Sequence, residues 1–247
     1  MTDLPQAILF DLDDTIISAY ARPEAAWLVV VEEFTDRLAP LSPIAVADAV
    51  IAESRIAWAD PDWQQRSRLR LNEARRDIVI GAFRRLAQAG NAAPADDLAV
   101  ALADRYSVYR HEQMHLFPQA HEVIDAWKGL GVRLALVTNG AAEVQRAKIA
   151  RFDLAHRFDH IQIEGEHDFG KPDDRAYRHA VATLGVDPAR TWMVGDNLEW
   201  EVEAPQRLGI FAIWHDVLGE GLPAGTTIRP DRIIRSFAEM MPQLSRT

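Results

Sequence analysis

Two carboxylates, Asp11 and Asp13, stand two residues apart in the stretch DLDDT, directly after the apolar run Ala7–Phe10. A short apolar run is typical of a buried strand, so both acids are expected where the chain leaves a sheet. Like charges this close repel each other unless a cation or a shared proton offsets the repulsion. A metal beside one carboxylate, with a second carboxylate able to move a proton, suits phosphoryl transfer through an aspartyl-phosphate. Taken alone, DLDDT is equally typical of a strand followed by a solvated acidic turn.

Residues that could bind or neutralise an anionic group or a metal follow three other strand-like runs. They are Thr138, Asn139 and Gly140 after 133–137, Lys171 a few residues after 161–163, and Asp196 after 191–194. In open α/β sheets, ligands bind beyond the carboxyl ends of the strands. Each group alone also fits a turn, a helix cap or a surface lysine. Their joint occurrence after successive strands favours a single shared site.

The sequence contains two kinds of segment, which differ in their hydrophobic pattern. Residues 1–16 and 117–247 read as strand–helix–strand units, in which Leu-Gly-Val or Leu-Gly-Ile at 130–132, 184–186 and 208–210 ends each amphipathic segment. The expected strands are 7–10, 133–137, 161–163, 191–194, 211–214 and 232–234. Apolar strands separated by helices are typical of a parallel sheet buried on both faces, so the fold class is α/β.

Residues 17–116 contain no convincing strand and have apolar residues at helical spacing, which predicts a helical insertion after the first strand. Prolines at 40, 43, 61 and 94 divide this insertion into about four helices. Seven arginines lie between residues 62 and 90, at positions 66, 68, 70, 75, 76, 84 and 85. Some of them could hold an anionic substrate, although for each one a solvated helix face is the commoner reason.

Composition narrows the possible partners. The chain of 247 residues has a net charge of −10, which disfavours broad contact with nucleic acid or an anionic membrane. No stretch approaches the ~18 consecutive apolar residues that a membrane helix needs, and no signal peptide is evident at the N-terminus. Cysteine is absent, which excludes disulfides and thiolate metal sites. These features predict a cytoplasmic protein.

Four short motifs resemble, in order, the signature motifs of the haloacid dehalogenase superfamily in its phosphatase branch. They are DLDDT at 11–15, VTNG at 137–140, GKP at 170–172 and VGDN at 194–197. The resemblance implies a Rossmann-like, doubly wound parallel sheet in a catalytic core of residues 1–16 and 117–247. It implies that residues 17–116 form the α-helical cap of that family. Further cues, Gln145-Arg146, Lys148-Ile149 and Gly165-Glu166, resemble the subgroup of sialic-acid-phosphate and nucleoside-monophosphate phosphatases.

The resemblance also implies catalytic roles. Asp11 would be the nucleophile that becomes phosphorylated, and Asp13 the general acid and then the general base. Thr138, with the neighbouring Asn139 and Gly140, would hold the phosphoryl oxygens. Lys171 would neutralise charge on the nucleophile and on the transferring group. The implied reaction is hydrolysis of a small phosphorylated metabolite, a phosphate monoester, by a monomer or homodimer.

A magnesium ion is the implied cofactor, because the implied ligands are hard oxygens. These ligands are the side chains of Asp11 and Asp196 and the backbone carbonyl of Asp13. One departure matters, since family members usually carry a second Asp after the fourth motif and this chain has Trp200 and Glu201 instead. Glu201 is a candidate metal ligand, and the alternative is an ordinary acid in the first turn of a helix.

Rival functions remain open on the sequence alone. Asp13 favours release of an alcohol from a phosphate over dehalogenation, because a leaving halide needs no proton. A phosphonate hydrolase would need a cap lysine, and residues 17–116 contain none. A receiver-like signalling domain uses similar residues, but it is about half this length and carries its phosphorylated Asp on a later strand. A phosphomutase with the same core and a catalytically weak member that only binds a phosphate ligand are the remaining alternatives.

Overall fold

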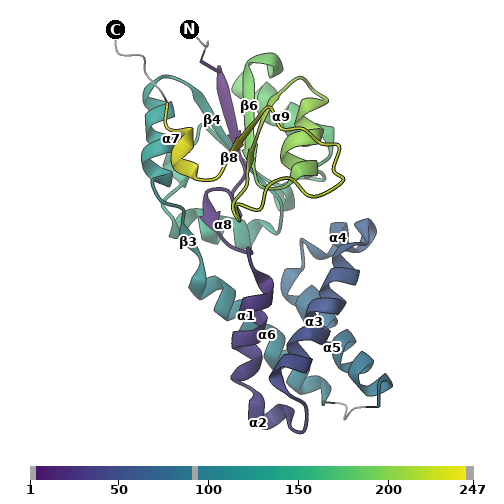
Figure 1. Ribbon diagram of the computed structural model, residues 1–247. Coiled ribbons are helices and arrows are strands. Elements are labelled where there is room, and N and C mark those ends of the chain that lie inside the picture. Colours follow the sequence, from purple (N-terminus) through teal and green to yellow (C-terminus); the bar gives the residue numbers. More distant parts are fainter. Residues whose placement is uncertain (1–3, 91–93, 243–247) are drawn as a thin grey trace. The chain divides into compact units, whose positions relative to one another are not determined.

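The computed structural model describes residues 4–90 and 94–242, which form two compact units (Figure 1). One unit contains Met1–Ala21 and His115–Thr247, and the other contains Arg22–Met114. The inserted unit is therefore slightly shorter than the predicted 17–116. Residues 17–21 and 115–116 belong to the first unit, which is called the core below.

The core is built on a six-stranded sheet in which every neighbouring pair is parallel. The strand order is β5-β4-β1-β6-β7-β8. The strands are β1 Ala7–Phe10, β4 Arg133–Thr138, β5 His160–Ile163, β6 Thr191–Gly195, β7 Phe211–His215 and β8 Arg232–Ile234. The predicted α/β class and all six expected strands are confirmed.

The position of β1 makes this sheet doubly wound. Strand β1 pairs with β4 on one side and with β6 on the other, so the winding direction reverses at β1. Open α/β sheets bind ligands at such a reversal, beyond the carboxyl ends of the strands. Asp11 follows β1 directly and therefore stands at that point.

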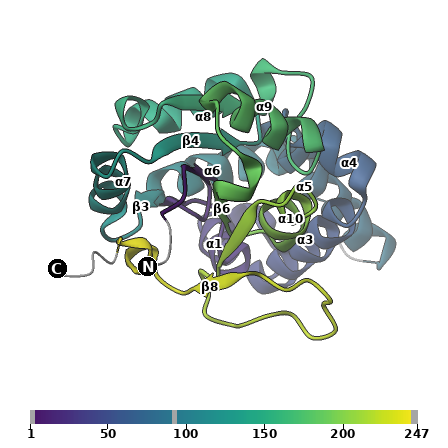
Figure 2. The ribbon, with the colours of Figure 1, turned by 90° about the horizontal axis from the view of Figure 1, so that it is seen from above.

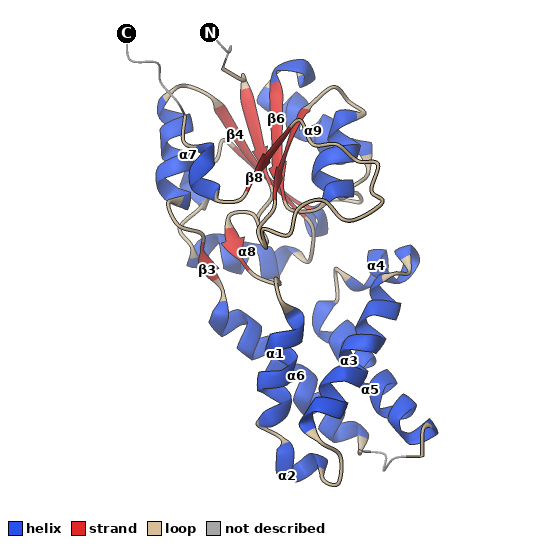
Figure 3. Cartoon of the chain, in the orientation of Figure 1, coloured by secondary structure: helices blue, strands red, loops and turns tan. Residues whose placement is uncertain are grey.

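Helices cover both faces of the sheet, which explains why β1 is entirely buried. Ala7 and Leu9 pack with residues of α9 (Asp174–Leu184), whereas Phe10 contacts Phe158 and Phe237, with ring centroids 6.2 and 5.8 Å apart. Successive side chains of a strand point to opposite faces, so these two sets define two core layers. Helix α7 (Ala120–Gly129) lies on the side opposite α9 (Figure 3).

Short helical elements complete the core. They are α8 Ala142–Arg151, α10 Ala204–Gln206, the 3₁₀ turns Ala155–Arg157, Glu164–Glu166, Pro188–Arg190 and Phe237–Met240, and a π-helix at Leu198–Glu203. The long connection 216–231 between β7 and β8 loops outward at the β8 edge (Figure 2). Of these elements, α8 and the π-helix come directly after strand ends that carry predicted site residues.

A two-stranded ribbon, absent from the sequence-based prediction, lies where the chain leaves and re-enters the core. Strand β2 (Ile17–Ser18) pairs antiparallel with β3 (His115–Leu116). Asp14 supports the ribbon, because its carboxylate accepts hydrogen bonds from the backbone N–H groups of residues 19–21. The ribbon holds side by side the two segments through which the chain leaves and re-enters the core.

The described part of the inserted unit contains six helices, so the expectation of about four was wrong. They are α1 Pro23–Glu32, α2 Thr35–Leu38, α3 Pro43–Trp58, α4 Pro61–Ser67, α5 Leu71–Gln88 and α6 Asp96–Gln113. Prolines begin α1, α3 and α4, where their missing N–H costs no hydrogen bond. The unit has an apolar core of its own, in which the rings of Trp27 and Tyr106 stack 3.6 Å apart.

Several of the clustered arginines have partners within the inserted unit. Arg76 forms a two-point ion pair with Asp104, at 2.7 and 2.9 Å, and Arg85 pairs with Glu53. Arg75 donates to the hydroxyl of Ser107 at 3.0 Å. For these three residues the described contacts join helices to one another. No helix in the described part of the chain is both long and apolar enough to cross a membrane.

His215, the last residue of β7, gives the core a built-in acid sensitivity. Burial lowers the pKa of His215 to about 4, against which a hydrogen bond to the backbone of Thr15 acts weakly. The ring is 2% exposed and Nδ1 has no partner among the described residues. The folded protein therefore resists protonation of His215 in a pH range where the unfolded chain accepts the proton readily.

We expect the free energy of unfolding to fall by about 2 kcal/mol between pH 7 and pH 5 because of His215. A lowered pKa means that the unfolded state binds more protons from pH 6.5 down to about 4, so acid favours unfolding across this window. Urea unfolding of the wild type and of His215→Phe at both pH values measures the contribution of His215 to this pH dependence. An equal pH dependence in the two proteins would contradict it.

Candidate active site

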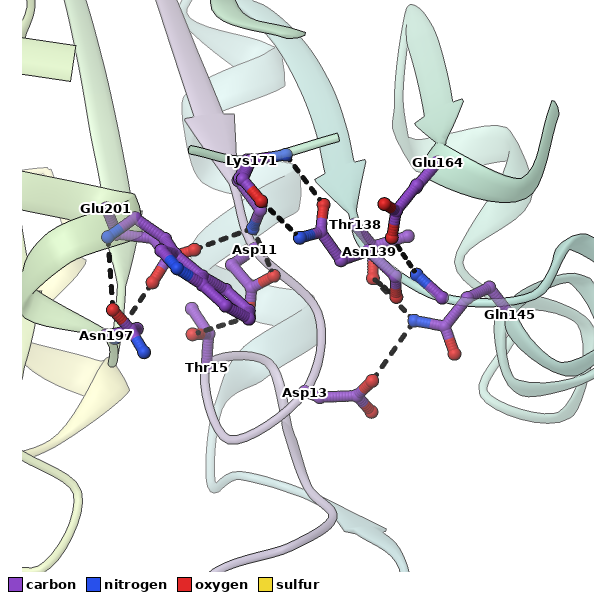
Figure 4. A network of polar contacts seen from close by, with 12 residues as sticks. Asp11, Asp13, Thr15, Thr138, Asn139, Gln145, Glu164, Lys171, Asn197 and Glu201 are labelled. Atoms are coloured by element: carbon purple, nitrogen blue, oxygen red, sulfur yellow. Dashed lines mark hydrogen bonds and ion pairs between the residues drawn. The ribbon is translucent and has the colours of Figure 1, made fainter. Parts of the chain in front are cut away.

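A buried lysine between two carboxylates forms the centre of the site (Figure 4). Nζ of Lys171 lies 2.5 Å from Oδ1 of Asp11 and 2.7 Å from Oε1 of Glu201. Lys171 and Glu201 are each 1% exposed. Burial alone would lower the pKa of Lys171, but the two carboxylates outweigh burial and raise it, so the lysine stays charged.

Backbone contacts fix the position of Lys171. Oδ1 of Asn139 accepts from the Lys171 N–H at 2.8 Å, and Nδ2 of Asn139 donates to the Lys171 carbonyl at 2.7 Å. This reciprocal pair joins the loop after β4 to the loop after β5. Gly170 permits the close approach, since a Cβ there would lie 2.6 Å from Cδ of Glu164 and 2.8 Å from Oδ1 of Asn139.

The π-helix Leu198–Glu203 places Glu201 against the lysine. Asn197 caps this helix by accepting from the N–H groups of residues 199 and 200, and its own N–H donates to Oε2 of Glu201 at 2.8 Å. Both carboxylate oxygens of Glu201 therefore have partners. The side chain passes over Gly195, where an added Cβ would lie 1.9 Å from Cγ of Glu201. Single π-turns recur at functional sites, and this one turns an acid inward.

Both the backbone and the side chain of Asp11 are held by hydrogen bonds. Its N–H donates to the carbonyl of Val194 at 2.9 Å, and its Oδ2 accepts from the hydroxyl of Thr15 at 3.1 Å. Burial raises the pKa of Asp11, Lys171 lowers it, and the nearby Asp13 raises it further. The carboxylate thus has defined partners on both oxygens and faces a cation.

Asp13 has a separate set of partners. Nζ of Lys148 lies 2.8 Å from both of its carboxylate oxygens, and Nε2 of Gln145 donates to Oδ2 at 3.1 Å. Lys148 also donates to the hydroxyl of Tyr20 at 2.9 Å. The two aspartates after β1 therefore face different lysines, which gives two neighbouring carboxylates different surroundings.

The predicted phosphate-binding residues lie beside these acids, with part of their hydrogen-bonding capacity already used. Thr138, the last residue of β4, is 2% exposed, and its Oγ1 accepts from Nε2 of Gln145, which also bonds Asp13. The side chain of Asn139 is occupied by Lys171. The N–H of Gly140 donates to Oε2 of Glu164 at 3.1 Å. Phosphate binding by these residues stays a prediction.

Asp196 follows β6 and gives the site an excess of negative charge. Burial raises the pKa of Asp196 well above its ordinary value, and the carboxylates of Glu201 and Asp11 raise it further. Burial likewise raises the pKa of Glu201 to about 7, although Lys171 acts against this shift. Three carboxyl groups share one ammonium here, so an added cation would relieve their repulsion.

The donor set fits a hard divalent cation. Asp11 and Asp196 supply carboxylate oxygens, and magnesium sites commonly use one or two carboxylates with waters and substrate phosphate. No cluster of three or more His, Asp or Glu side chains within residues 4–90 and 94–242 is arranged to hold a metal. Glu201 is turned toward Lys171 and Asn197, so the geometry gives it partners other than a metal.

The structure brings together all the residues that the motifs singled out, from the ends of four adjacent strands. It also adds residues whose roles the sequence did not reveal, above all Lys148, Gln145 and Thr15. Lys148 and Gln145 had been noted only as marks of a subgroup. The two residues are three apart and share a face of α8, where both are 2% exposed, but their spacing in the sequence does not by itself indicate that they reach Asp13.

The comparison with protein families agrees with this geometry. The model of the haloacid dehalogenase-like hydrolases matches residues 5–209, which is most of the chain. The chain belongs to this family. A solved structure with a similar fold is the putative hydrolase YfnB of Bacillus subtilis, described as bound to magnesium, with a TM-score of 0.68 and 23% identity over 96% of this chain and 97% of that one.

The most similar curated proteins include three phosphatases. Phosphoserine phosphatase of Thermus thermophilus is 40% identical over 101 residues, or 41% of each chain. N-acylneuraminate-9-phosphatase of Rattus norvegicus is 34% identical over 44% of each chain. Pyrimidine 5'-nucleotidase PynA of Streptococcus pneumoniae is 23% identical over 97% of this chain and 94% of its own. The chain thus spans less than half the length of the first two relatives, and the predicted resemblance to phosphatases of this family is confirmed.

We expect Gly195→Ala to displace Glu201 and to lower the free energy of unfolding by about 1–3 kcal/mol, the usual cost of overpacking. The new Cβ would overlap Cγ of Glu201, so the contacts of Glu201 with Lys171 and Asn197 cannot both survive. Gly129→Ala is the matched control, because a Cβ at Gly129 meets no atom within 4 Å. Denaturant unfolding of both variants measures the difference, and equal stability would refute the packing argument.

Proposed function

We propose that this protein is a magnesium-dependent phosphatase that hydrolyses a small phosphorylated metabolite through an aspartyl-phosphate on Asp11. The arrangement after β1 carries the proposal. Asp11 is buried beside the ammonium of Lys171, and Asp13, two residues on, has its own partners. One carboxylate can then attack phosphorus while the other handles protons.

The two steps use residues of this chain in turn. Asp11 attacks phosphorus, and Asp13 donates a proton to the leaving alcohol as its bond to phosphorus breaks. Asp13 then accepts a proton from the water that releases phosphate from Asp11. Lys171 stabilises the negative charge beside Asp11 in both steps, and Glu201 holds Lys171 in place. Thr138 would donate its hydroxyl to a phosphoryl oxygen.

Magnesium would be held by the carboxylates of Asp11 and Asp196 and the backbone carbonyl of Asp13. A bound magnesium ion supplies charge stabilisation to the phosphoryl oxygens. The shared negative charge of Asp11, Asp196 and Glu201 supports this assignment. We assign Glu201 to the support of Lys171, because its Oε1 pairs with the Lys171 ammonium and its Oε2 accepts from the backbone N–H of Asn197.

The relatives support the proposed substrate class. The chain resembles enzymes named for phosphoserine, N-acylneuraminate 9-phosphate and pyrimidine nucleotides, all small phosphate monoesters. We also propose that Arg22–Met114 is the cap domain of the family. A cytoplasmic location and a monomeric or homodimeric state stay predictions. A phosphomutase with the same core remains the alternative enzyme, and a panel of metabolite phosphates analysed for isomerised as well as hydrolysed product distinguishes the two.

We expect the purified protein to release phosphate from p-nitrophenyl phosphate with Mg²⁺ present. Asp11→Asn removes the nucleophile and should abolish turnover, whereas Asp13→Asn should lower kcat by about 10²–10⁴ through loss of acid–base catalysis. Asp125→Asn, an exposed acid of the same unit, is the control. Circular dichroism checks that each variant is folded. Wild-type activity in Asp11→Asn would sink the proposed mechanism, and an inactive wild type would favour a member that only binds its ligand.

A second expectation concerns the metal. Magnesium that binds only the folded state should raise the Tm of the wild type, because binding to the folded state stabilises it. Asp196→Asn removes a proposed ligand, so Mg²⁺ should raise its Tm much less. Differential scanning fluorimetry with a magnesium titration measures both, with Asp125→Asn as the control. An undiminished magnesium effect in Asp196→Asn would exclude Asp196 as a ligand.

A further inference from the structure

The carboxylate of Asp13 accepts several hydrogen bonds, which restrict its orientation. Oδ1 accepts one hydrogen bond, from Lys148, and Oδ2 accepts two, from Lys148 and Gln145. An ionised carboxylate has about four acceptor positions on its two oxygens. The described residues therefore fill three of them, and the remaining position is on Oδ1.

The lysine that holds Asp13 is itself fixed. Lys148 is 2% exposed and is charged, because the attraction of Asp13 and Tyr20 outweighs the effect of burial, which lowers its pKa. Its ammonium donates to the Tyr20 hydroxyl at 2.9 Å and lies 4.8 Å from the centre of the Tyr20 ring. A buried charge with this many partners has little freedom to move.

Gln145 connects the carboxylate of Asp13 to the end of the neighbouring strand β4. Gln145 and Lys148 are three residues apart on α8, so both reach Asp13 from one helix face. The amide nitrogen of Gln145 contacts both Thr138 and Asp13. The end of β4 and the loop after β1 are thereby linked through one side chain.

We propose that Lys148 is a positioning residue which, with Gln145 and Tyr20, orients Asp13 so that Oδ1 is the oxygen that exchanges the proton. The inference rests on the proposed function and deepens it. In the first step, a carboxylate oxygen of Asp11 bonds phosphorus, the bond between phosphorus and the leaving oxygen breaks, and the proton on Oδ1 of Asp13 passes to that oxygen. In the second step, a water proton passes to Oδ1 while the water oxygen bonds phosphorus and the bond from phosphorus to Asp11 breaks.

This role predicts an effect that depends on the leaving group. A phenolate such as p-nitrophenolate leaves readily without a proton, whereas an alkoxide requires one. Loss of a properly oriented acid should therefore slow the cleavage of alkyl phosphates much more than that of aryl phosphates. A side chain that only packs the core would affect both substrates alike.

The test compares kcat/KM for p-nitrophenyl phosphate and for propyl phosphate in the wild type and in Lys148→Met. We expect a loss of about 10- to 100-fold on propyl phosphate, part of the usual contribution of a general acid, and less than about threefold on the aryl substrate. Tyr20→Phe, which removes one acceptor of the Lys148 ammonium, should show the same selectivity at a smaller size. Lys128→Met, an exposed lysine of the same unit, is the control and should change neither value.

The outcomes separate the inference from the proposed function. Equal losses on the two substrates, or no loss, in Lys148→Met would overturn the positioning role while leaving the phosphatase intact. Lys148→Arg should restore part of the selective loss, since it keeps the charge and the donors. If Lys148→Met does not fold, Tyr20→Phe decides, and an unselective effect there overturns the proposal. A wild type inactive on both esters removes the proposed function and the inference with it.

Discussion

One buried cation holds this site together. The buried ammonium of Lys171 lies 2.5 Å from Asp11 and 2.7 Å from Glu201, and each partner follows a different strand. Removing the lysine would leave two carboxylates buried without compensation, which is among the most destabilising changes a protein interior can suffer. The surrounding structure is arranged accordingly. Asn139 fixes the lysine backbone, Gly170 and Gly195 leave room for the side chains that approach it, and the π-helix turns Glu201 inward.

The departure at position 201 has a physical explanation in these contacts. A glutamate has a longer side chain than the aspartate usual in the family, and here the extra length carries its carboxylate to Lys171 and to the Asn197 N–H. Three buried acids then share a single lysine, and burial, together with the charge of the neighbouring carboxylates, raises the pKa of Asp196 and of Glu201. Excess negative charge at the end of a parallel sheet favours a cation, and in the proposed mechanism Asp196 shares that cation with Asp11.

Much of this fold could be predicted from the sequence. Six apolar runs marked the six strands, because strands buried on both faces leave a nearly uninterrupted apolar signature. The order of the motifs indicated Asp11, Lys171 and Asp196 for the same reason, since parallel strands deliver their carboxyl ends to one edge. The π-helix, the β2–β3 ribbon and the holding of Asp13 by Lys148 could not be predicted. The first depends on how Glu201 fits above Gly195, the second on pairing between residues about a hundred positions apart, and the third on side chains whose separation in sequence carries no signal.

The ribbon of Ile17–Ser18 with His115–Leu116 joins the two places where the chain leaves and re-enters the core. Because the chain departs and returns at paired backbone positions, the sheet and its acids are assembled without any segment between residues 22 and 114. The intervening helices are thus a module inserted at one place in the core, between β2 and β3. Evolution can lengthen, shorten or exchange such a module, while the sheet and the acids at its edge stay unaltered.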